Sequence, residues 1–154
     1  MSRVRYNVAA KAASGETGSV GIPGLTSISI VSHGHAELLE PLLDDLQKHR
    51  STEIEVILTL NVKESLPFDP ASFAFSIEVI QNTSPRGFAA NHNSAFRAAR
   101  GEYFCVLNPD IRLNADPFPA LVGELKDKSV GAVDRKSTRL NSSHDDLSRM
   151  PSSA

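Results

Sequence analysis

The residues with the clearest chemical potential follow an apolar run at 103–107 that is typical of a buried strand. Directly after this run come Asn108, Pro109 and Asp110. A carboxylate that proline fixes at the tip of a strand can hold Mg²⁺ or Mn²⁺, because these hard cations prefer oxygen ligands and can bridge phosphates. An Asn-Pro-Asp sequence is also a common turn. The residues alone therefore leave both interpretations of Asp110 open.

A second group of polar residues lies between 82 and 93. Asn82 ends a β-branched run, Arg86 and Gly87 follow in a turn, and Asn91 comes early in the next predicted helix. Amides that are buried near a helix start need hydrogen-bond partners. Arg86 and the neighbouring backbone N–H groups suit the diphosphate of a nucleotide. Capping of the helix by Asn and Ser is the alternative, and it needs no ligand.

Two more polar segments follow the first two predicted strands. Ser32, His33 and Gly34 form a glycine-containing turn, which lets a nucleotide approach the backbone closely. Zinc is disfavoured there, because no Cys, Asp or Glu completes a ligand set at a familiar spacing. Asn61 follows the second strand and can bond a nucleobase or a ribose, although a solvated loop start explains it equally well.

Each of these segments begins where a predicted strand ends. Strands are predicted at 27–32, 53–60, 76–81, 103–107 and 130–133, and helices at 36–49, 87–100 and 117–128, the second of them with Phe88 and Phe96 as its larger apolar anchors. Alternating strands and helices imply right-handed βαβ units and a parallel sheet that is covered on both faces. In such sheets ligands bind beyond the carboxyl ends of the strands, where these polar residues fall.

The composition narrows the class of protein. The 154 residues are 40% hydrophobic and 22% charged with a net charge of −2, which excludes a largely disordered chain and argues against a nucleic-acid binder. The lone cysteine, Cys105, excludes an internal disulfide. No run approaches the ~18 apolar residues of a membrane span, and no secretory signal is recognisable. We therefore expect an α/β protein that lies in the cytoplasm. Attachment to the inner face of the membrane is left open.

Taken in order, the motifs resemble those of the family 2 glycosyltransferases, inverting enzymes of the GT-A fold, over residues 26–133. The family opens with a strand of the type SIVIVSYN, and residues 29–35 read SIVSHGH. Its later motif GFxxNxNxA is matched at 87–95 and AxGxY at 99–103, and LNPD at 107–110 stands where other members carry Asp-x-Asp. The Asn-Pro-Asp form is similar to the rhamnosyl- and galactofuranosyltransferase-like members, which build bacterial surface polysaccharides.

The resemblance implies a Rossmann-like, mostly parallel sheet flanked by helices, which in this chain would end after about five strands. It implies transfer of a sugar from a UDP-, dTDP- or GDP-sugar to a saccharide or lipid-linked acceptor, with no nucleic-acid partner. Asp110 would hold the Mg²⁺ or Mn²⁺ that neutralises the leaving nucleoside diphosphate. The residues implied in donor binding are Ser32, His33, Gly34, Asn61, Asn82, Arg86, Gly87, Asn91 and Asn108. A non-catalytic α/β nucleotide-binding or interaction module is the alternative.

Two departures from the family pattern concern the chemistry. Where the family often has an acidic residue that reads the base, this chain has Asn61. The carboxylate that deprotonates the acceptor comes well after the Asp110 motif in this family. No such acceptor-binding half follows in the chain, so no catalytic residue is assigned to it and the fragment is expected to be inactive.

The composition also divides the chain into three zones. Residues 1–25 are rich in Gly, Ser, Ala and Thr and are predicted to be a flexible leader, and 26–133 are the expected nucleotide-sugar-binding half-domain. Residues 134–144 resemble the translation of a common short-read sequencing adapter, and 148–154 resemble its continuation in the same frame after an index-sized gap. We therefore expect 134–154 to be an artefactual, disordered tail.

Overall fold

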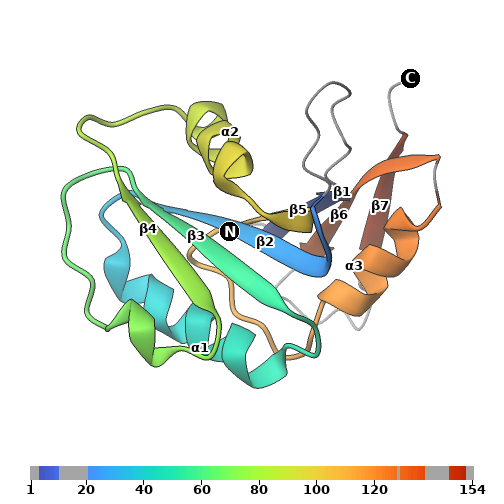
Figure 1. Cartoon of the computed structure of the whole chain (residues 1–154), viewed down its shortest axis with the longest axis horizontal. Helices are drawn as coiled ribbons and strands as arrows, with labels where there is room; N and C mark the ends of the chain where they lie inside the picture. Colours follow the sequence, from blue (N-terminus) through green and yellow to red (C-terminus); the bar gives the residue numbers. More distant parts are fainter. Residues whose placement is uncertain (1–3, 11–20, 128, 138–145, 152–154) are drawn as a thin grey trace.

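The described strands of this computed structural model form one sheet in the order β4-β3-β2-β5-β1-β6-β7 (Figure 1). The structure describes residues 4–10, 21–127, 129–137 and 146–151. The strands are β1 Val4–Ala10, β2 Ile22–Ser32, β3 Ile54–Leu60, β4 Ser76–Gln81, β5 Gly101–Leu107, β6 Val130–Ser137 and β7 Asp146–Pro151. The helices are α1 Leu39–His49, α2 Phe88–Ala98 and α3 Phe118–Leu125, with short 3₁₀ turns η1 Ala36–Leu38 and η2 Pro70–Ser72.

The strands β4, β3, β2 and β5 run parallel to one another. Every residue of β3 is buried, as expected for a strand with packed layers on both faces. The register places Ser32 beside Leu60, Leu60 beside Gln81, and Ile30 beside Leu107. The carboxyl ends of these four strands therefore meet at one edge of the sheet, where the sequence predicts ligand binding.

The helices cover the two faces of the sheet unequally. In Figure 1, α1 and α2 lie on opposite sides of the sheet. The side with α1 and α3 holds the larger apolar core, with leucines of α1 at three- and four-residue spacing. Its fully buried members include Ile28, Ile30, Leu39, Leu42, Leu43, Leu46, Phe118 and Leu121. The main mass of the hydrophobic core thus lies away from α2.

The face under α2 is smaller and more polar. Its apolar cluster contains the short side chains of Ala95 and Ala99. The polar residues Ser27, Ser29 and Glu55 are buried within the sheet. Since buried polar groups need partners, this composition forces a hydrogen-bonded interior instead of a purely apolar one.

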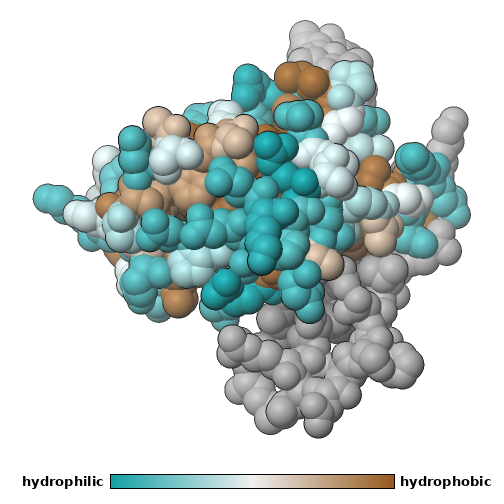
Figure 2. Space-filling model, turned by 90° about the horizontal axis from the view of Figure 1, so that it is seen from below, coloured by the Kyte–Doolittle hydropathy of each residue, from teal (hydrophilic) through white to brown (hydrophobic). Residues whose placement is uncertain are grey.

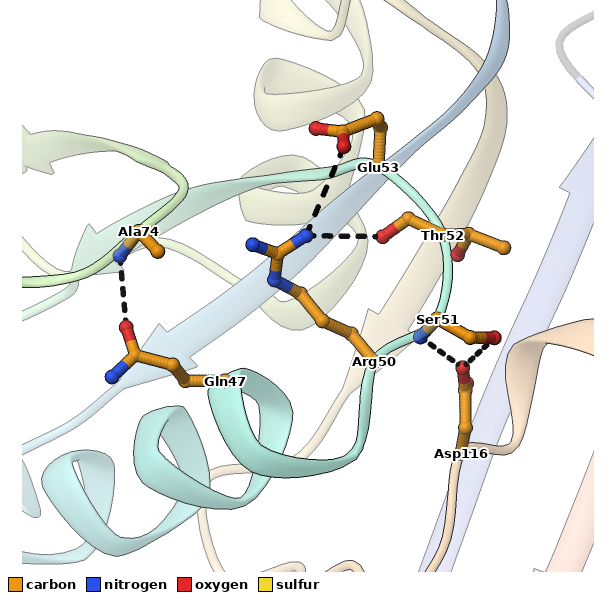
Figure 3. Close-up of polar contacts among 7 residues, drawn as sticks. All are labelled: Gln47, Arg50, Ser51, Thr52, Glu53, Ala74 and Asp116. Carbon is orange, nitrogen blue, oxygen red and sulfur yellow. Dashed lines mark hydrogen bonds and ion pairs between the residues drawn. The ribbon is translucent and has the colours of Figure 1, made fainter.

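Hydrogen bonds also tie the connections at the amino ends of the strands (Figure 3). Asp116 Oδ2 accepts from the backbone N and the Oγ of Ser51, both at 2.6 Å, and its Oδ1 accepts from Phe118 N at 2.9 Å. Gln47 Oε1 accepts from Ala74 N at 2.8 Å. These bonds link the end of α1 to the start of α3 and to the segment before β4.

The outward face of α1 carries exposed polar residues, among them Glu40, Asp44 and Lys48. Figure 2, which views the molecule from below, shows a surface on which hydrophilic residues predominate. No helix in the described ranges is both long and apolar enough to cross a membrane.

The predicted order of strands and helices between residues 27 and 133 is confirmed, and the strand at 76–81 has the predicted bounds. The predicted α/β fold, a sheet flanked by helices, is confirmed, but the sheet has more strands than the five expected: β1 inserts antiparallel between β5 and β6, and β7 pairs antiparallel with β6. The parallel part is limited to the four strands β4, β3, β2 and β5.

The zone boundaries also shift. Residues 4–10 of the predicted leader form β1, and the alternation of Val4, Tyr6 and Val8 with polar residues is the strand signal that the Gly- and Ser-rich surroundings obscured. Strand β6 continues past 133 to Ser137, and 146–151 form β7, so these parts of the predicted tail belong to the sheet. The adapter origin of residues 134–154 stays a prediction.

Candidate functional site

A cavity of about 240 Å³ opens beside the carboxyl ends of β2, β3 and β5 and the start of α2. Its wall combines polar side chains with a few apolar ones. The residues that line it are Val31, His33, Asn61, Arg86, Phe88, Asn91, His92, Leu107 and Asn108. A concave site with a small number of converging polar groups is the usual form of a small-molecule site.

The connection after β2 is held in place by hydrogen bonds to its own backbone. Ser32 is fully buried, and its Oγ accepts from His35 N at 3.2 Å. Gly34 has a φ of 77°, a left-handed conformation that favours glycine. The carboxylate of Glu64 accepts from Gly34 N at 3.2 Å and from Ala36 N at 2.9 Å. Glu64 thus fixes the turn that carries His33 into the cavity wall.

Three asparagines at the ends of β3 and β4 and in α2 form a connected group, which we call the amide cluster: Asn61, Asn82 and Asn91. Asn61 Oδ1 accepts from Arg86 N at 2.8 Å and from Asn82 Nδ2 at 2.9 Å. Asn61 Nδ2 donates to Arg86 O at 3.0 Å and lies 3.0 Å from His33 Nδ1. The cluster therefore joins the turns after β2 and β4 through neutral groups.

Asn91 completes the amide cluster from the helix side. It is 1% exposed, its Nδ2 donates to Arg86 O at 3.2 Å, and its Oδ1 accepts from Asn82 Nδ2 at 2.8 Å. Within the described part of the chain, the N-cap of α2 is Gly87, which forms no side-chain cap. The capping alternative for these asparagines is therefore wrong, because Asn61 and Asn91 hold the Arg86 backbone and Asn82 donates to both of them.

The start of α2 adds an aromatic pair that the sequence did not predict in this role. Phe88 was expected to be a buried anchor, but it is 66% exposed and lines the cavity. Its ring centroid lies 4.3 Å from that of His92 in an edge-on arrangement. Phe96, the other expected anchor, is 37% exposed and packs edge-on against Phe104 at 5.1 Å.

His92 is a buried histidine in the cavity wall. It is 7% exposed, and its Nδ1 lies 2.8 Å from Ser29 Oγ. Burial lowers the pKa of His92 to about 4, because a charged imidazole would lose its hydration. The ring is therefore neutral at pH 7, and it contributes hydrogen bonding without charge.

The Asn108 and Asp110 segment borders the cavity on the β5 side. Asn108 lines the cavity, whereas Asp110 is exposed and does not. Among the described residues, no group hydrogen-bonds or pairs with the Asp110 carboxylate, and no three His, Cys, Asp or Glu gather to form a metal site. A lone, unpaired carboxylate fits a hard cation only where the ligand supplies further oxygens, as a diphosphate does.

The structure thus brings half of the ten predicted site residues into one cavity wall. His33, Asn61, Arg86, Asn91 and Asn108 line one cavity. Ser32, Gly34, Asn82 and Gly87 do not line it, although they shape the turns around it. Sequence reasoning missed Glu64, His92 and the exposed Phe88. Only Phe88 and His92 carried a signal, since their four-residue spacing places them on the same side of a helix.

Comparison with known proteins agrees with this architecture. Among solved structures, a mannosyltransferase, PcManGT from Pyrobaculum calidifontis, in complex with GDP-mannose and Mn²⁺, is similar with a TM-score of 0.61 and 23% sequence identity. The match covers 69% of this chain and 33% of that one, so the chain spans about a third of the length of that protein. None of the curated protein sequences matches significantly.

The sequence family gives the more direct result. The family profile described as "Glycosyl transferase family 2" matches residues 27–149, which include every strand end and turn of the cavity. The GT-A-type fold and the motifs at 87–95 and 107–110 agree with that match. This chain belongs to glycosyl transferase family 2.

Proposed function

We propose that this chain binds the donor of an inverting, metal-assisted sugar transfer, with the cavity at the strand ends as the nucleotide site. The observation that carries the proposal is the amide cluster, which fixes the Arg86 backbone without using its guanidinium. Arg86 is exposed and lines the cavity, so its side chain is available to a phosphate. His33 and Asn108 lie in the same wall and suit contacts to the nucleoside.

A divalent cation fits this proposal through Asp110. When bound there between the carboxylate and a diphosphate, Mg²⁺ or Mn²⁺ would neutralise the charge of the leaving nucleoside diphosphate. Asp110 would contribute one oxygen ligand, and Arg86 would supply a second positive charge to the diphosphate. The solved mannosyltransferase with GDP-mannose and Mn²⁺ supports this choice of metal and donor class.

The acceptor side of the reaction has no matching group in this cavity. Among the residues that line it, none is Asp or Glu, His92 is buried and neutral, and the Nδ1 of His33 is engaged with Asn61 Nδ2 at 3.0 Å. Deprotonation of an acceptor hydroxyl needs a positioned base. We therefore propose that the chain as printed binds donor without transferring it. Trace transfer by the purified chain with any UDP-, dTDP- or GDP-sugar would contradict this.

The finer assignments rest on the Asn-Pro-Asp form of the motif at 108–110. By its similarity to rhamnosyl- and galactofuranosyltransferase-like members, we infer that the sugar transfer served by this site uses a saccharide or lipid-linked acceptor in bacterial surface polysaccharide synthesis. We place this sugar transfer in the cytoplasm or at the inner face of the membrane.

The test compares two exposed aspartates. GDP, UDP and dTDP are titrated into the chain by calorimetry with and without Mn²⁺, using Asp110→Asn and the control Asp44→Asn on the outer face of α1. Asp110→Asn is expected to lower the Mn²⁺-dependent affinity about tenfold, and Asp44→Asn to leave it unchanged. Nucleotide binding that is independent of Mn²⁺ and of Asp110 would favour the alternative, a non-catalytic nucleotide-binding module.

A further inference from the structure

The amide of Asn61 has a fixed orientation, because one of its partners has only one hydrogen-bonding role. The backbone N–H of Arg86 can only donate, so the Asn61 atom 2.8 Å away is the carbonyl oxygen Oδ1. The other atom is therefore Nδ2, whose two hydrogens face Arg86 O at 3.0 Å and His33 Nδ1 at 3.0 Å. Arg86 O can only accept, which agrees with this orientation.

This orientation decides the proton position on His33. Since Asn61 Nδ2 donates, His33 Nδ1 must accept, and a neutral imidazole with an accepting Nδ1 carries its hydrogen on Nε2. His33 is exposed and lines the cavity. The ring therefore offers a ligand in the cavity an N–H donor, and its other nitrogen is already used by the protein.

The same count shows that Asn61 has nothing left for a ligand. A carboxamide has two N–H donors and two acceptor lone pairs. Arg86 O and His33 Nδ1 take both donors, and Arg86 N and Asn82 Nδ2 take both lone pairs. The residue is only 6% exposed. Its polar atoms are saturated inside the protein.

We propose that Asn61 is a positioning residue without ligand contact, and that His33 reads a carbonyl oxygen of the nucleoside through its Nε2–H. This inference rests on the proposed nucleotide site and changes the role of one member of it. A donor at this place complements guanine O6 or the O4 of uracil and thymine, and it opposes the amino group of adenine or cytosine.

The first test reads the tautomer directly and needs no ligand. Two-bond ¹H–¹⁵N correlation spectra of the unmodified chain should show the His33 proton on Nε2 at neutral pH. Asn61→Asp replaces the donor with a carboxylate oxygen that can only accept, so the proton of His33 should move to Nδ1. A predominantly Nδ1-protonated His33 in the unmodified chain would overturn the assignment, even if Asn61→Asp fails to fold.

The second test separates base reading from phosphate binding. His33→Gln keeps an N–H donor near the Nε2 position, whereas the shorter His33→Asn does not reach it. With Mn²⁺ present, His33→Asn should lower the affinity for GDP or UDP about fivefold relative to His33→Gln, and both variants should bind inorganic pyrophosphate as the unmodified chain does. Equal nucleotide affinities in the two variants would refute base reading by His33.

The two hypotheses fail in different ways. If the unmodified chain binds neither pyrophosphate nor nucleotide, the proposed function and the reading role both fail, while the tautomer of His33 still decides the role of Asn61. If nucleotide binds but the two His33 variants do not differ, the proposed function survives and only the reading role is wrong.

Discussion

The two ends of the same parallel strands solve the problem of buried polar groups in different ways. At the amino ends, Glu55 is a buried carboxylate: Oε1 accepts from Ser27 Oγ at 2.6 Å and from Arg100 N at 2.7 Å, and Oε2 accepts from Arg100 Nε at 2.8 Å. Arg100 Nη2 completes an ion pair at 2.7 Å, and Ser27 Oγ accepts from Gly101 N at 2.8 Å. At the carboxyl ends, the amide cluster uses neutral groups throughout.

The difference concerns where charge is left over. The charge of Glu55 is matched within the protein: burial raises its pKa, but the hydrogen bond from Ser27 and then the hydrogen bonds and charge of Arg100 hold it below the ordinary 4.5. The amide cluster fixes the backbone of Arg86, and within the described ranges neither its guanidinium nor the Asp110 carboxylate has an ionic partner. One end therefore stabilises the sheet, and the other keeps charges available for a ligand.

The largest expected effect is on the Glu55 end. Glu55→Ala removes three hydrogen bonds and one ion pair from a site that is 5% exposed, and it leaves Ser27 Oγ and Arg100 N without their acceptor. We expect the free energy of unfolding to fall by about 3 kcal/mol, measured by urea denaturation. Glu53→Ala is the control: its side chain is 85% exposed and its ion pair with Arg50 spans 4.0 Å, so little change is expected (Figure 3).

If Glu55→Ala proved no worse than Glu53→Ala, the amino ends would not be the stabilising end and the comparison would fail.

The next effect separates the two ends by pH. His92 has a pKa lowered from 6.5 to about 4, so the unfolded chain binds more protons between these values, and stability falls as the pH is lowered through that range. The loss is at most about 3 kcal/mol. The pKa of Glu55 is lowered from 4.5, so its contribution is present above pH 4.5 and is lost only as the pH falls further.

Acid titration of the unfolding free energy should therefore show the His92 end weakening first. In His92→Gln the unfolding free energy should no longer fall between pH 6.5 and 4. The fall below pH 4.5, which is due to Glu55, should remain. A pH dependence that is the same in both proteins would mean that His92 is not held neutral by burial.

The sequence predicted where the strands end, but not how the side chains at those ends bond to one another. Largely apolar, β-branched runs such as β3 identify buried parallel strands, so the strand ends and the polar residues that follow them could be located in advance. Which amide atom of Asn61 faces which neighbour depends on the approach of the turn at Arg86 to the end of β3, a contact between distant segments that no local pattern encodes. Strand β1 was missed because its alternation is short and its pairing with β5 is long-range.

Phe88 shows the same limit within a helix. The spacing of apolar residues indicates one face of α2, but the face is covered only where the sheet extends beneath it. Ala95 and Ala99 lie over the sheet and are buried, whereas Phe88 lies at the edge of the cavity and is exposed.

The smallest expected effect on stability tests whether the carboxyl ends hold a shape for binding. Glu64→Gln replaces one acceptor oxygen with an amide nitrogen, so the side chain can no longer accept from both Gly34 N and Ala36 N. Because Glu64 is only half-buried and both bonds lie near the surface, unfolding should become easier by no more than about 1 kcal/mol. Amide hydrogen exchange at Gly34 and Ala36 should nevertheless accelerate, since the turn opens locally without global unfolding.

Glu37→Gln is the matched control for this turn, because Glu37 lies on the neighbouring η1 and is exposed. If the turn presents His33 to the nucleoside, Glu64→Gln should lower the affinity for nucleotide severalfold. The affinity for pyrophosphate should stay unchanged, because the turn that loses order is the one that carries His33 and not the one that carries Arg86. Faster exchange at Gly34 with unaltered nucleotide affinity would show that the turn is ordered for stability alone. The contrast between a stabilising amino end and a binding carboxyl end would then be limited to the amide cluster and Asp110.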